Sequence, residues 1–344
     1  MSKTSPLITD GLRLSEAFAR IRGASRSDLS PSLSIRQQRL SKLEALLEDN
    51  QLALCRAISE DFGHRSTHET RLLEIFPSLE GIRHARKQLK CWMKPQRRPV
   101  SLWFQPGRAE VRPQALGCVG IVTPWNYPLF LAIGPLTAAF SAGNRALIKM
   151  SEFTPSTATL FAELAARYFA PEELAVIGGD HELAQRFSEL PFDHLLFTGS
   201  TSVGRHVMRA AAENLTPVTL ELGGKSPAII APDYPMAKAA ARIMAGKCLN
   251  AGQTCIAPDY VFLPAGQEND FIAAARAVVA ASYPDLAQNP DYSAVVNTRH
   301  ASRLRSYLAD AAAKGAQIIP LAEVPGKDGG PQRLAPTLVV QPDD

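Results

Sequence analysis

Two short glycine-containing segments carry the side chains of this sequence that are best suited to acyl chemistry. Glu221 stands in Leu220-Glu221-Leu222-Gly223-Gly224, and Cys255 ends the segment Gly252-Gln253-Thr254-Cys255. A thiolate can attack a carbonyl carbon, and a carboxylate can activate the water that later releases the acyl group. The pattern predicts a cysteine nucleophile, Cys255, and a general base, Glu221. The alternative for an isolated cysteine is a small buried hydrophobic residue.

No other set of residues offers a competing reaction centre. The sequence has no GxSxG or HExxH motif, and its seven histidines form no recognisable triad or metal motif. Its five cysteines form no CxxC pair and lack the spacing of metal ligands. We therefore expect free thiols in a reducing, cytoplasmic environment, and no metal ion.

Composition and charge exclude several classes of partner. The 344 residues are 46% hydrophobic and 20% charged, and the net charge of +4 is too small to indicate a nucleic-acid partner. Basic residues gather between 83 and 98, where the alternatives are a solvated helix face and a site for an anionic partner. The N-terminus has no apolar signal-peptide core, and the most apolar run, 128–140, is too short to span a bilayer.

The elements that must position the reactive residues alternate between strands and helices. We expect strands at 118–123, 146–150, 174–177, 194–198 and 217–222, and helices at 128–142, 155–168, 182–190 and 202–214. This alternation predicts an open parallel sheet covered by helices, with ligand sites beyond the carboxyl ends of the strands. A second α/β unit is expected after it, with strands at 228–230, 260–263, 317–320 and 337–340, and helices at 236–249, 270–281 and 298–313.

The first 94 residues are expected to form a helical layer beside this sheet. Residues 1–30 have the composition of a poorly ordered or loosely docked segment, Ser66 is a candidate helix N-cap, and Pro77 is expected to kink or split a helix. Pro95 to Arg112 predicts a projecting β-hairpin, in which Val100, Leu102 and Phe104 alternate with other residues before the Pro106-Gly107 turn. Such a hairpin is marginal alone and requires a partner sheet, which another subunit could supply.

One predicted strand end could hold the pyrophosphate of a dinucleotide. Gly199, Ser200 and Thr201 join a strand to a helix that contains Gly204. The free N–H groups and positive end of that helix would bind phosphate oxygens. The usual GxGxxG fingerprint is absent, so the alternative is a strand–turn–helix with a purely structural role.

A second strand end could bind the ribose. Lys149 and Glu152 lie at the end of the strand at 146–150 and could hydrogen-bond ribose hydroxyls, the alternative being a solvated loop. A carboxylate there repels a 2′-phosphate, so Glu152 favours NAD over NADP.

At these motifs the chain resembles the aldehyde dehydrogenase superfamily. The matching segments, in chain order, are Pro124-Trp125-Asn126-Tyr127-Pro128, Lys149-Met150-Ser151-Glu152, Phe197-Thr198-Gly199-Ser200-Thr201, 220–227 and 252–255. The short N-terminal arm and residues 255–260 resemble the class 3 branch. Within it, Pro191-Phe192-Asp193-His194 and the helix at 132–139 resemble coniferyl aldehyde dehydrogenases.

The resemblance implies a role for each site residue. Cys255 attacks the aldehyde, the Asn126 side-chain amide and the Cys255 backbone N–H hold the oxyanion, and Glu221 activates water. The resemblance also implies an aromatic, coniferaldehyde-like substrate, a homodimer, and NAD as cofactor with NADP as the alternative. The implied cofactor-binding residues are Thr123, Pro124, Trp125, Lys149, Glu152, Gly199, Ser200, Thr201, Gly204, Leu222 and Gly223.

The resemblance further implies an α/β protein with two domains and a hairpin. These are a nucleotide-binding domain at 1–94 and 116–222, an oligomerisation hairpin at 95–115, and a catalytic domain at 223–344 that is incomplete, because family members continue past this point. A catalytically silent remnant that keeps the nucleotide-binding fold is therefore one alternative. A CoA-acylating aldehyde dehydrogenase is another, which Glu221 disfavours because CoA would replace the hydrolytic water.

Overall fold

The computed structural model describes residues 5–323 and 332–341, which belong to two compact units. The first unit comprises Met1–Leu54 and Leu72–Glu221, and the second comprises Cys55–Arg71 and Leu222–Asp344. Residues 55–71 were expected to belong to the N-terminal helical layer, but they are part of the second unit. Their polar groups hydrogen-bond to later residues of that unit: the His64 ring contacts the Pro290 carbonyl at 2.9 Å, and the Ser66 hydroxyl donates to Asp291 at 3.1 Å.

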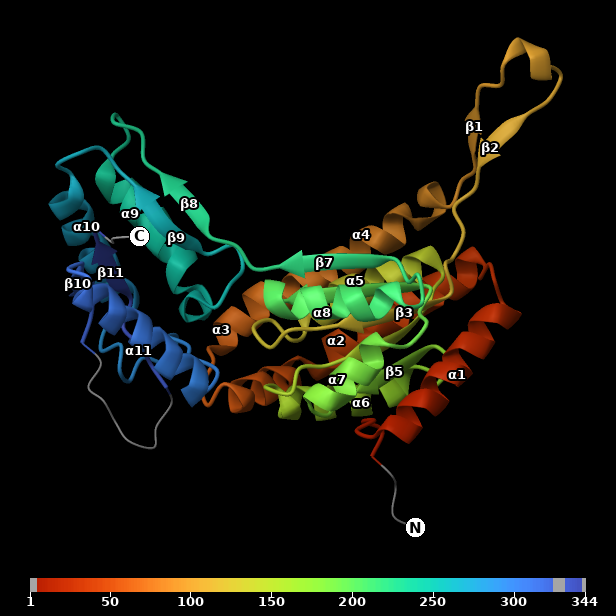
Figure 1. The fold of residues 1–344 in the computed structure, drawn as a ribbon, viewed down its shortest axis with the longest axis horizontal. Helices are drawn as coiled ribbons and strands as arrows, with labels where there is room; N and C mark the ends of the chain where they lie inside the picture. Colours follow the sequence, from red (N-terminus) through yellow and green to blue (C-terminus); the bar gives the residue numbers. More distant parts are fainter. Residues whose placement is uncertain (1–4, 324–331, 342–344) are drawn as a thin grey trace. The chain divides into compact units, whose positions relative to one another are not determined.

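The first unit is built on a five-stranded sheet with the order β5-β4-β3-β6-β7 (Figure 1). The strands are β3 (Cys118–Val122), β4 (Arg145–Lys149), β5 (Leu174–Ile177), β6 (His194–Gly199) and β7 (Val218–Leu222). β3 pairs in parallel with both β4 and β6, and β4 with β5, so the predicted parallel sheet is confirmed. The carboxyl ends of these strands therefore meet at one edge, as the sequence alternation requires.

A helix follows each of the strands β3, β4, β5 and β6, as predicted. These helices are α5 (Phe130–Ala142), α6 (Pro155–Tyr168), α7 (His181–Ser188) and α8 (Thr201–Ala212). Gly143 ends α5 in the left-handed conformation (φ 90°), which a glycine adopts without steric cost. Val119, Ile121, Leu147 and Ile148 are buried beneath the helices, and such continuous apolar strands are typical of a parallel sheet covered on its faces.

The N-terminal segment is a docked helix, so the expectation of loose docking is wrong for residues 11–27. Asp10 caps α1 (Gly11–Ser27) by accepting the Arg13 N–H at 2.9 Å. Leu14, Phe18 and Ile21 are buried, because their spacing forms one apolar stripe that faces the sheet.

Long helices complete the first unit and carry the chain into the second. α2 (Leu33–Asp61) is kinked at Asn50, and α3 (Thr67–Thr70) is capped by Ser66, the predicted N-cap. A π-helical turn at Arg71–Ile75 leads into α4 (Phe76–Trp92), which has Pro77 in its first turn. The predicted interruption at Pro77 is therefore a change of helix type just before the proline.

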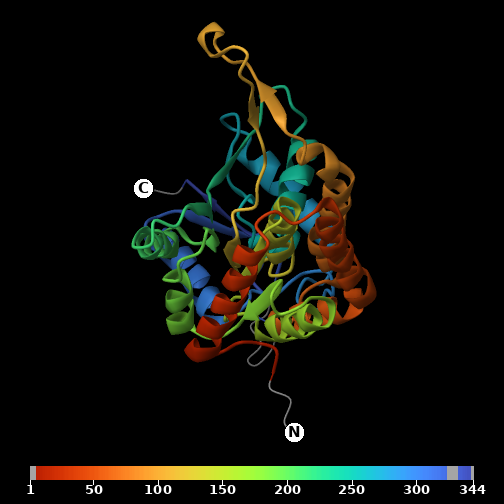
Figure 2. The same ribbon diagram turned by 90° about the vertical axis from the view of Figure 1, so that its right-hand side faces the viewer.

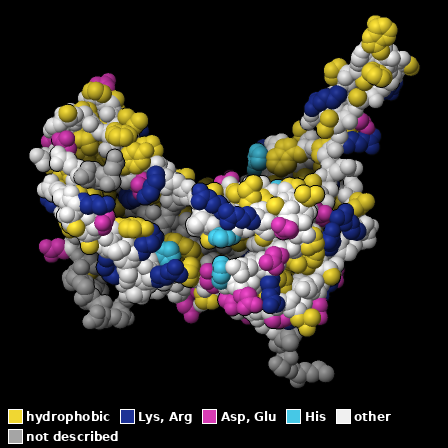
Figure 3. Space-filling view, in the orientation of Figure 1, with side chains coloured by type: hydrophobic (Ala, Val, Ile, Leu, Met, Phe, Trp, Pro, Cys, Tyr) yellow, Lys and Arg dark blue, Asp and Glu magenta, His cyan; other side chains and the backbone are white. Residues whose placement is uncertain are grey.

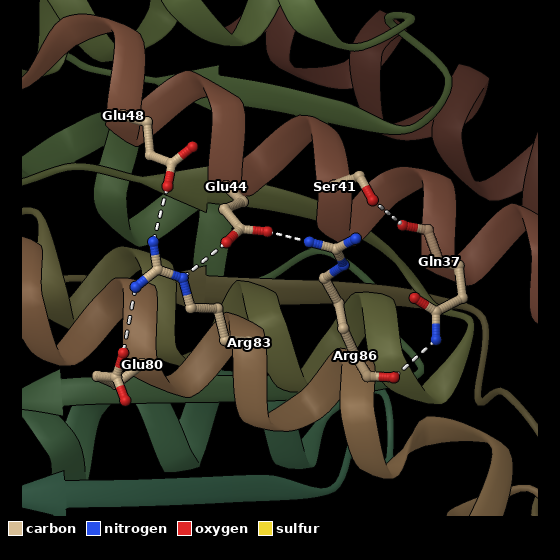
Figure 4. A network of polar contacts seen from close by, with 7 residues as sticks. All are labelled: Gln37, Ser41, Glu44, Glu48, Glu80, Arg83 and Arg86. Carbon is tan, nitrogen blue, oxygen red and sulfur yellow. Dashed lines mark hydrogen bonds and ion pairs between the residues drawn. The ribbon is translucent and has the colours of Figure 1, made fainter.

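Part of the basic cluster lies between α2 and α4 and is neutralised there (Figure 4). Arg83 donates to Glu44 at 2.8 Å, to Glu48 at 2.7 Å and to Glu80 at 3.2 Å, and Arg86 also binds Glu44. These arginines therefore serve helix packing rather than an anionic partner.

The projecting hairpin is present, but its strands are shorter than the alternating pattern predicts. β1 (Gln96–Arg98) pairs antiparallel with β2 (Ala109–Val111), and Leu102–Phe104 form a 3₁₀ turn at the tip. The predicted strand at 100–104 is wrong because Pro99 cannot donate to a ladder, and the Phe104 N–H bonds the Ser101 carbonyl instead. Figures 1 and 2 show the hairpin extending from its unit, and Figure 3 shows hydrophobic side chains at its tip.

In its described residues from 222 onwards, the second unit packs two small sheets with helices α9, α10 and α11. β8 (Ser226–Ile229) pairs in parallel with β9 (Pro258–Phe262), and β10 (Gln317–Pro320) pairs antiparallel with β11 (Thr337–Val340). The helices are α9 (Met236–Cys248), α10 (Glu268–Ser282) and α11 (Thr298–Ala313). Met244, Phe271 and Val279 are at the core between α9 and α10. Among the described residues, no helix is long and apolar enough to cross a membrane.

Candidate active site

The carboxyl edge of the first unit's sheet brings together several predicted cofactor residues. Thr123, which follows β3, donates its N–H to the Lys149 carbonyl at 3.0 Å, and its buried hydroxyl lies 3.3 Å from the same oxygen. Lys149 is the last residue of β4, and its side chain is 1% exposed. Thr123 and Lys149 are therefore neighbours at the strand ends, as the topology predicted.

The Lys149 ammonium turns back onto the main chain. Its Nζ donates to the Met150 carbonyl at 2.7 Å and to the Gly179 carbonyl at 3.2 Å. Burial lowers the Lys149 pKa, while the charges of Glu152 and Asp180 act in the opposite direction. An ammonium has three donors, so one remains beyond these two bonds for a further acceptor such as a hydroxyl. Glu152 itself is exposed.

The start of α8 has the predicted features of a phosphate site. Ser200 is its N-cap and accepts the Val203 N–H at 3.4 Å, while its carbonyl accepts the Gly204 N–H at 2.9 Å. The N–H groups of Thr201 and Ser202 lie in the first turn, where a helix has no carbonyl of its own to offer them. A side chain at Gly199 would meet the Phe197 ring, because a Cβ there would lie 2.5 Å from it. The donor set fits an anionic group at the helix N-terminus.

The predicted oxyanion donor, Asn126, lies in the loop between β3 and α5. Pro124, Trp125 and Asn126 are all half-buried. The far end of this loop is held by a residue that the sequence analysis did not select: Glu74 Oε2 accepts the N–H of Leu129 at 2.8 Å and that of Phe130 at 3.0 Å. Glu74 is fully buried, so the start of α5 is tied to the π-helical turn.

Glu221 is at the end of β7, and its side chain is exposed. Leu222 closes the strand, and Gly223 and Gly224 follow as an exposed loop. A Cβ at Gly224 would lie 3.4 Å from the Cys255 carbonyl, so this loop passes close to the backbone of the predicted nucleophile within the second unit.

Cys255 is exposed and follows an unusual turn. Asn250, Ala251 and Gly252 have φ values of 52°, 51° and 78°, so three consecutive residues are left-handed. This conformation is unfavourable for residues with a Cβ and persists only where the surroundings enforce it. The turn carries the chain from the end of α9 to Cys255, which presents its thiol to solvent.

A buried hydrogen bond holds the start of this turn, and two partly buried ones hold its end. The Asn250 N–H donates to Glu69 Oε1 at 3.0 Å. Gln253 Nε2 donates to the Ala294 carbonyl at 3.0 Å, and its Oε1 accepts the Val296 N–H at 3.0 Å. Glu69 was also not selected from the sequence. Its only signal was its place three residues after the N-cap Ser66, a position typical of a capping box.

The other cysteines are poorly placed for nucleophilic chemistry. Cys55, Cys118 and Cys248 are buried, and burial raises the pKa of Cys118 to about 12 and that of Cys248 to about 11. Cys91 is exposed on α4, away from any predicted site residue in the sequence. In the described part of the chain no group of histidine, cysteine and acidic residues could hold a metal ion.

Comparison with known proteins identifies the class. Residues 15–344 match the model of the aldehyde dehydrogenase family. A probable coniferyl aldehyde dehydrogenase of Pseudomonas aeruginosa is 54% identical over 332 residues, which cover 96% of this chain and 69% of the relative. A coniferyl aldehyde dehydrogenase of a Pseudomonas species, strain HR199, is 46% identical over 335 residues with the same coverage.

Solved structures agree with the family assignment. The substrate-bound state of Staphylococcus aureus AldH matches with a TM-score of 0.88 and 34% identity, covering 95% of this chain and 70% of that one. A Mycobacterium tuberculosis aldehyde dehydrogenase complexed with NAD+ matches with a TM-score of 0.85 and 27% identity, covering 98% and 70%. The chain therefore belongs to the aldehyde dehydrogenase family, whose members oxidise aldehydes. The resemblance inferred from the motifs, including that to coniferyl aldehyde dehydrogenases, is confirmed.

Proposed function

We propose that this chain oxidises an aldehyde to the carboxylic acid through a covalent intermediate on Cys255. The observation that carries the proposal is the exposed Cys255 thiol at the end of a turn fixed by buried and partly buried hydrogen bonds, in a chain of the aldehyde dehydrogenase family. A fixed, accessible thiol can meet a carbonyl carbon at a reproducible distance, which is the main requirement for rapid attack.

In the first step the Cys255 thiolate forms a bond to the aldehyde carbon, and the carbonyl oxygen becomes an oxyanion. The Asn126 side-chain amide and the Cys255 N–H would donate to this oxygen. One such donor commonly lowers the barrier by about 3 kcal/mol, because it acts where charge develops. The Glu74 anchor supports this role for Asn126 by fixing the far end of its loop.

The aldehyde carbon is oxidised in the next step: the oxyanion collapses, the carbon loses a hydride, and a thioester on Cys255 results. Oxidation of this carbon requires a hydride acceptor, which a nicotinamide would supply when bound. Glu221 then removes a proton from water, which attacks the thioester, and the acid leaves as the thiolate is regenerated. An exposed glutamate near the end of a strand, followed by two exposed glycines, suits a base that must reach water.

The residues at the sheet edge fit a dinucleotide cofactor. The first-turn amides of α8, with Gly199, Ser200, Thr201 and Gly204, suit a pyrophosphate, and Lys149 has one donor left for a ribose hydroxyl. The exposed Glu152 carboxylate would repel a 2′-phosphate and so favours NAD over NADP. We include Thr123, Pro124, Trp125, Leu222 and Gly223 in the proposed cofactor site because they lie at or directly after the strand ends.

We propose an aromatic, coniferaldehyde-like substrate and a homodimer. The substrate follows from the names of the two coniferyl aldehyde dehydrogenases that this chain resembles. The dimer is supported by the hairpin at 95–115, whose tip exposes Leu102, Trp103 and Phe104, with Trp103 90% exposed. The free thiols fit a cytoplasmic enzyme.

The assay is NADH formation from coniferaldehyde and NAD+, with and without CoA. We expect turnover without CoA, its loss in Cys255→Ala, and no change in Cys91→Ala, which removes the other exposed thiol. Turnover that requires CoA, or that survives Cys255→Ala, would overturn the proposal.

A further inference from the structure

We infer that Glu69 is a positioning residue for the nucleophile: it fixes the left-handed turn that leads to Cys255. The inference rests on the proposed role of Cys255 and concerns contacts within the second unit alone. Glu69 lies in α3, far from Cys255 in the sequence, and no motif links the two.

Both oxygens of the buried Glu69 carboxylate accept hydrogen bonds. Oε1 accepts the Asn250 N–H at 3.0 Å, and Oε2 accepts the Ser293 hydroxyl at 2.6 Å. Glu69 is 6% exposed and Asn250 is fully buried, so water cannot replace this acceptor without opening the structure. The carboxylate therefore acts on the backbone of the turn at its first residue.

The conformation of the turn explains why it requires such an anchor. Asn250 and Ala251 are left-handed although both carry a Cβ, and Gly252 continues the conformation. An L-residue returns readily to negative φ unless its backbone groups are held. If the bond from Asn250 to Glu69 is lost, the turn can relax, and the direction in which the chain enters Cys255 changes with it.

Gln253 is a second anchor of the turn, and it binds the same segment of the chain as Glu69 does. Gln253, two residues before Cys255, is bonded to the backbone of Ala294 and Val296. Ser293, next to Ala294, is the residue that donates to Glu69. The segment 293–296 thus fixes Gln253 directly and Glu69 through Ser293, so the path from Asn250 to Gln253 is defined at both ends.

The charges around Glu69 come from several elements. Arg65 and Asp291 act on it with opposite signs, and Ser66 links α3 to Asp291 at 3.1 Å. What the turn requires from residue 69, however, is an acceptor oxygen at the correct distance. Glutamine supplies that oxygen without the charge, whereas aspartate supplies the charge on a side chain one methylene shorter.

The test compares Glu69→Gln, Glu69→Asp and Glu69→Ala in the full chain. We expect Glu69→Gln to keep kcat within about threefold of the original. We expect Glu69→Ala and Glu69→Asp to lower kcat by about 10- to 100-fold with little change in KM, because the nucleophile is displaced while the binding surfaces remain. Hydrogen exchange of the peptide containing 250–255 should accelerate in the same two variants and not in Glu69→Gln.

A merely structural role predicts a different pattern: lower unfolding stability in all variants, with kcat of the folded fraction unchanged. That result, or a Glu69→Asp variant more active than Glu69→Gln, would overturn the inference. If Glu69→Ala does not fold, the comparison of the other two still decides it.

Failure of the proposed function can be distinguished from failure of the inference about Glu69. Activity that persists in Cys255→Ala refutes the role of Cys255. Unchanged exchange at 250–255 in Glu69→Asp refutes the anchoring, whatever the chemistry.

Discussion

Two buried glutamates accept hydrogen bonds from backbone segments of different conformation. Glu74 in the first unit binds the N–H groups of Leu129 and Phe130, just after the loop that carries Asn126. Glu69 in the second unit binds the N–H of Asn250, at the start of the turn that leads to Cys255. Both carboxylates are more than nine-tenths buried.

The difference lies in what each backbone would do without its anchor. No described residue from Pro124 to Phe130 has a positive φ, so Glu74 caps a backbone whose conformation these residues adopt without strain. Three consecutive residues of the Cys255 turn are left-handed, so Glu69 maintains a shape that the local sequence does not favour. Loss of Glu74 should therefore reduce stability first, and loss of Glu69 should reduce catalytic rate first.

The largest effect is expected from the side chain that the first anchor supports. Asn126→Ala should lower kcat by about 10²- to 10³-fold, because it removes one donor to the oxyanion. Unfolding stability should change little, since the side chain is half-buried at a loop. Steady-state kinetics and urea unfolding measure the two quantities. A variant with near-original kcat would show that Asn126 does not bind the oxyanion.

Glu74→Ala should lower the free energy of unfolding by about 2–4 kcal/mol, because two buried amides lose their acceptor. The matched control is Glu80→Ala in the same helical region. Glu80 is exposed and bonds the half-exposed Arg83 at 3.2 Å, so its loss should change stability by less than about 1 kcal/mol. Urea unfolding of both variants provides the comparison, and equal losses would contradict the assignment of Glu74 as a buried anchor.

The left-handed turn can be tested without touching its anchors. Gly252→Ala should destabilise by about 1–2 kcal/mol, since φ is 78° and a Cβ would lie 3.2 Å from the Lys247 carbonyl. Gly246→Ala, in nearby α9, should instead stabilise by about 0.5–1 kcal/mol, because its Cβ meets only ordinary contacts. Thermal unfolding of the pair should shift in opposite directions. A shift of the same sign would indicate that the turn is not held left-handed.

The smallest effect is a pH dependence at Glu69. Burial raises the pKa of Glu69 above its usual value, despite the donors Ser293 and Asn250 and the charge of Arg65. Between the unfolded and folded pKa values the folded state binds more protons than the unfolded state, so stability falls as pH rises through this window. Glu69→Gln lacks this titration. The stability of the original protein relative to Glu69→Gln should therefore decline as pH rises, and an increase would contradict the raised pKa.

Most of the fold could be predicted from the sequence. The strands of the parallel sheet and helices such as Pro155–Tyr168 and Thr298–Ala313 were recovered because their apolar patterns are strong and local. The N-terminal helix was missed because its apolar stripe is short and lies among charged residues. The hairpin strands were misplaced because alternation alone does not account for prolines that cannot donate to a ladder.

The residues of the proposed site also fall into those that the sequence indicates and those that only the structure reveals. Cys255 and Glu221 could be proposed from short motifs in which reactive side chains stand beside glycine, and Asn126 from the resemblance of its segment to the family. Glu69 and Glu74 could not, because an anchoring carboxylate is defined by the distant amides that it binds. Residues 250 and 129 become its partners only in three dimensions. The assignment of residues 55–71 to the second unit was missed for the same reason.

The most direct measurement is mass spectrometry of a trapped intermediate. Glu221→Gln, incubated with coniferaldehyde and NAD+ and then quenched in acid, should retain the acyl group because hydrolysis is slowed. The account predicts a mass increase on the peptide that contains Cys255 and none on the peptide that contains Cys91. An acyl group on another residue, or NADH formation with no acylated peptide at any time, would contradict it.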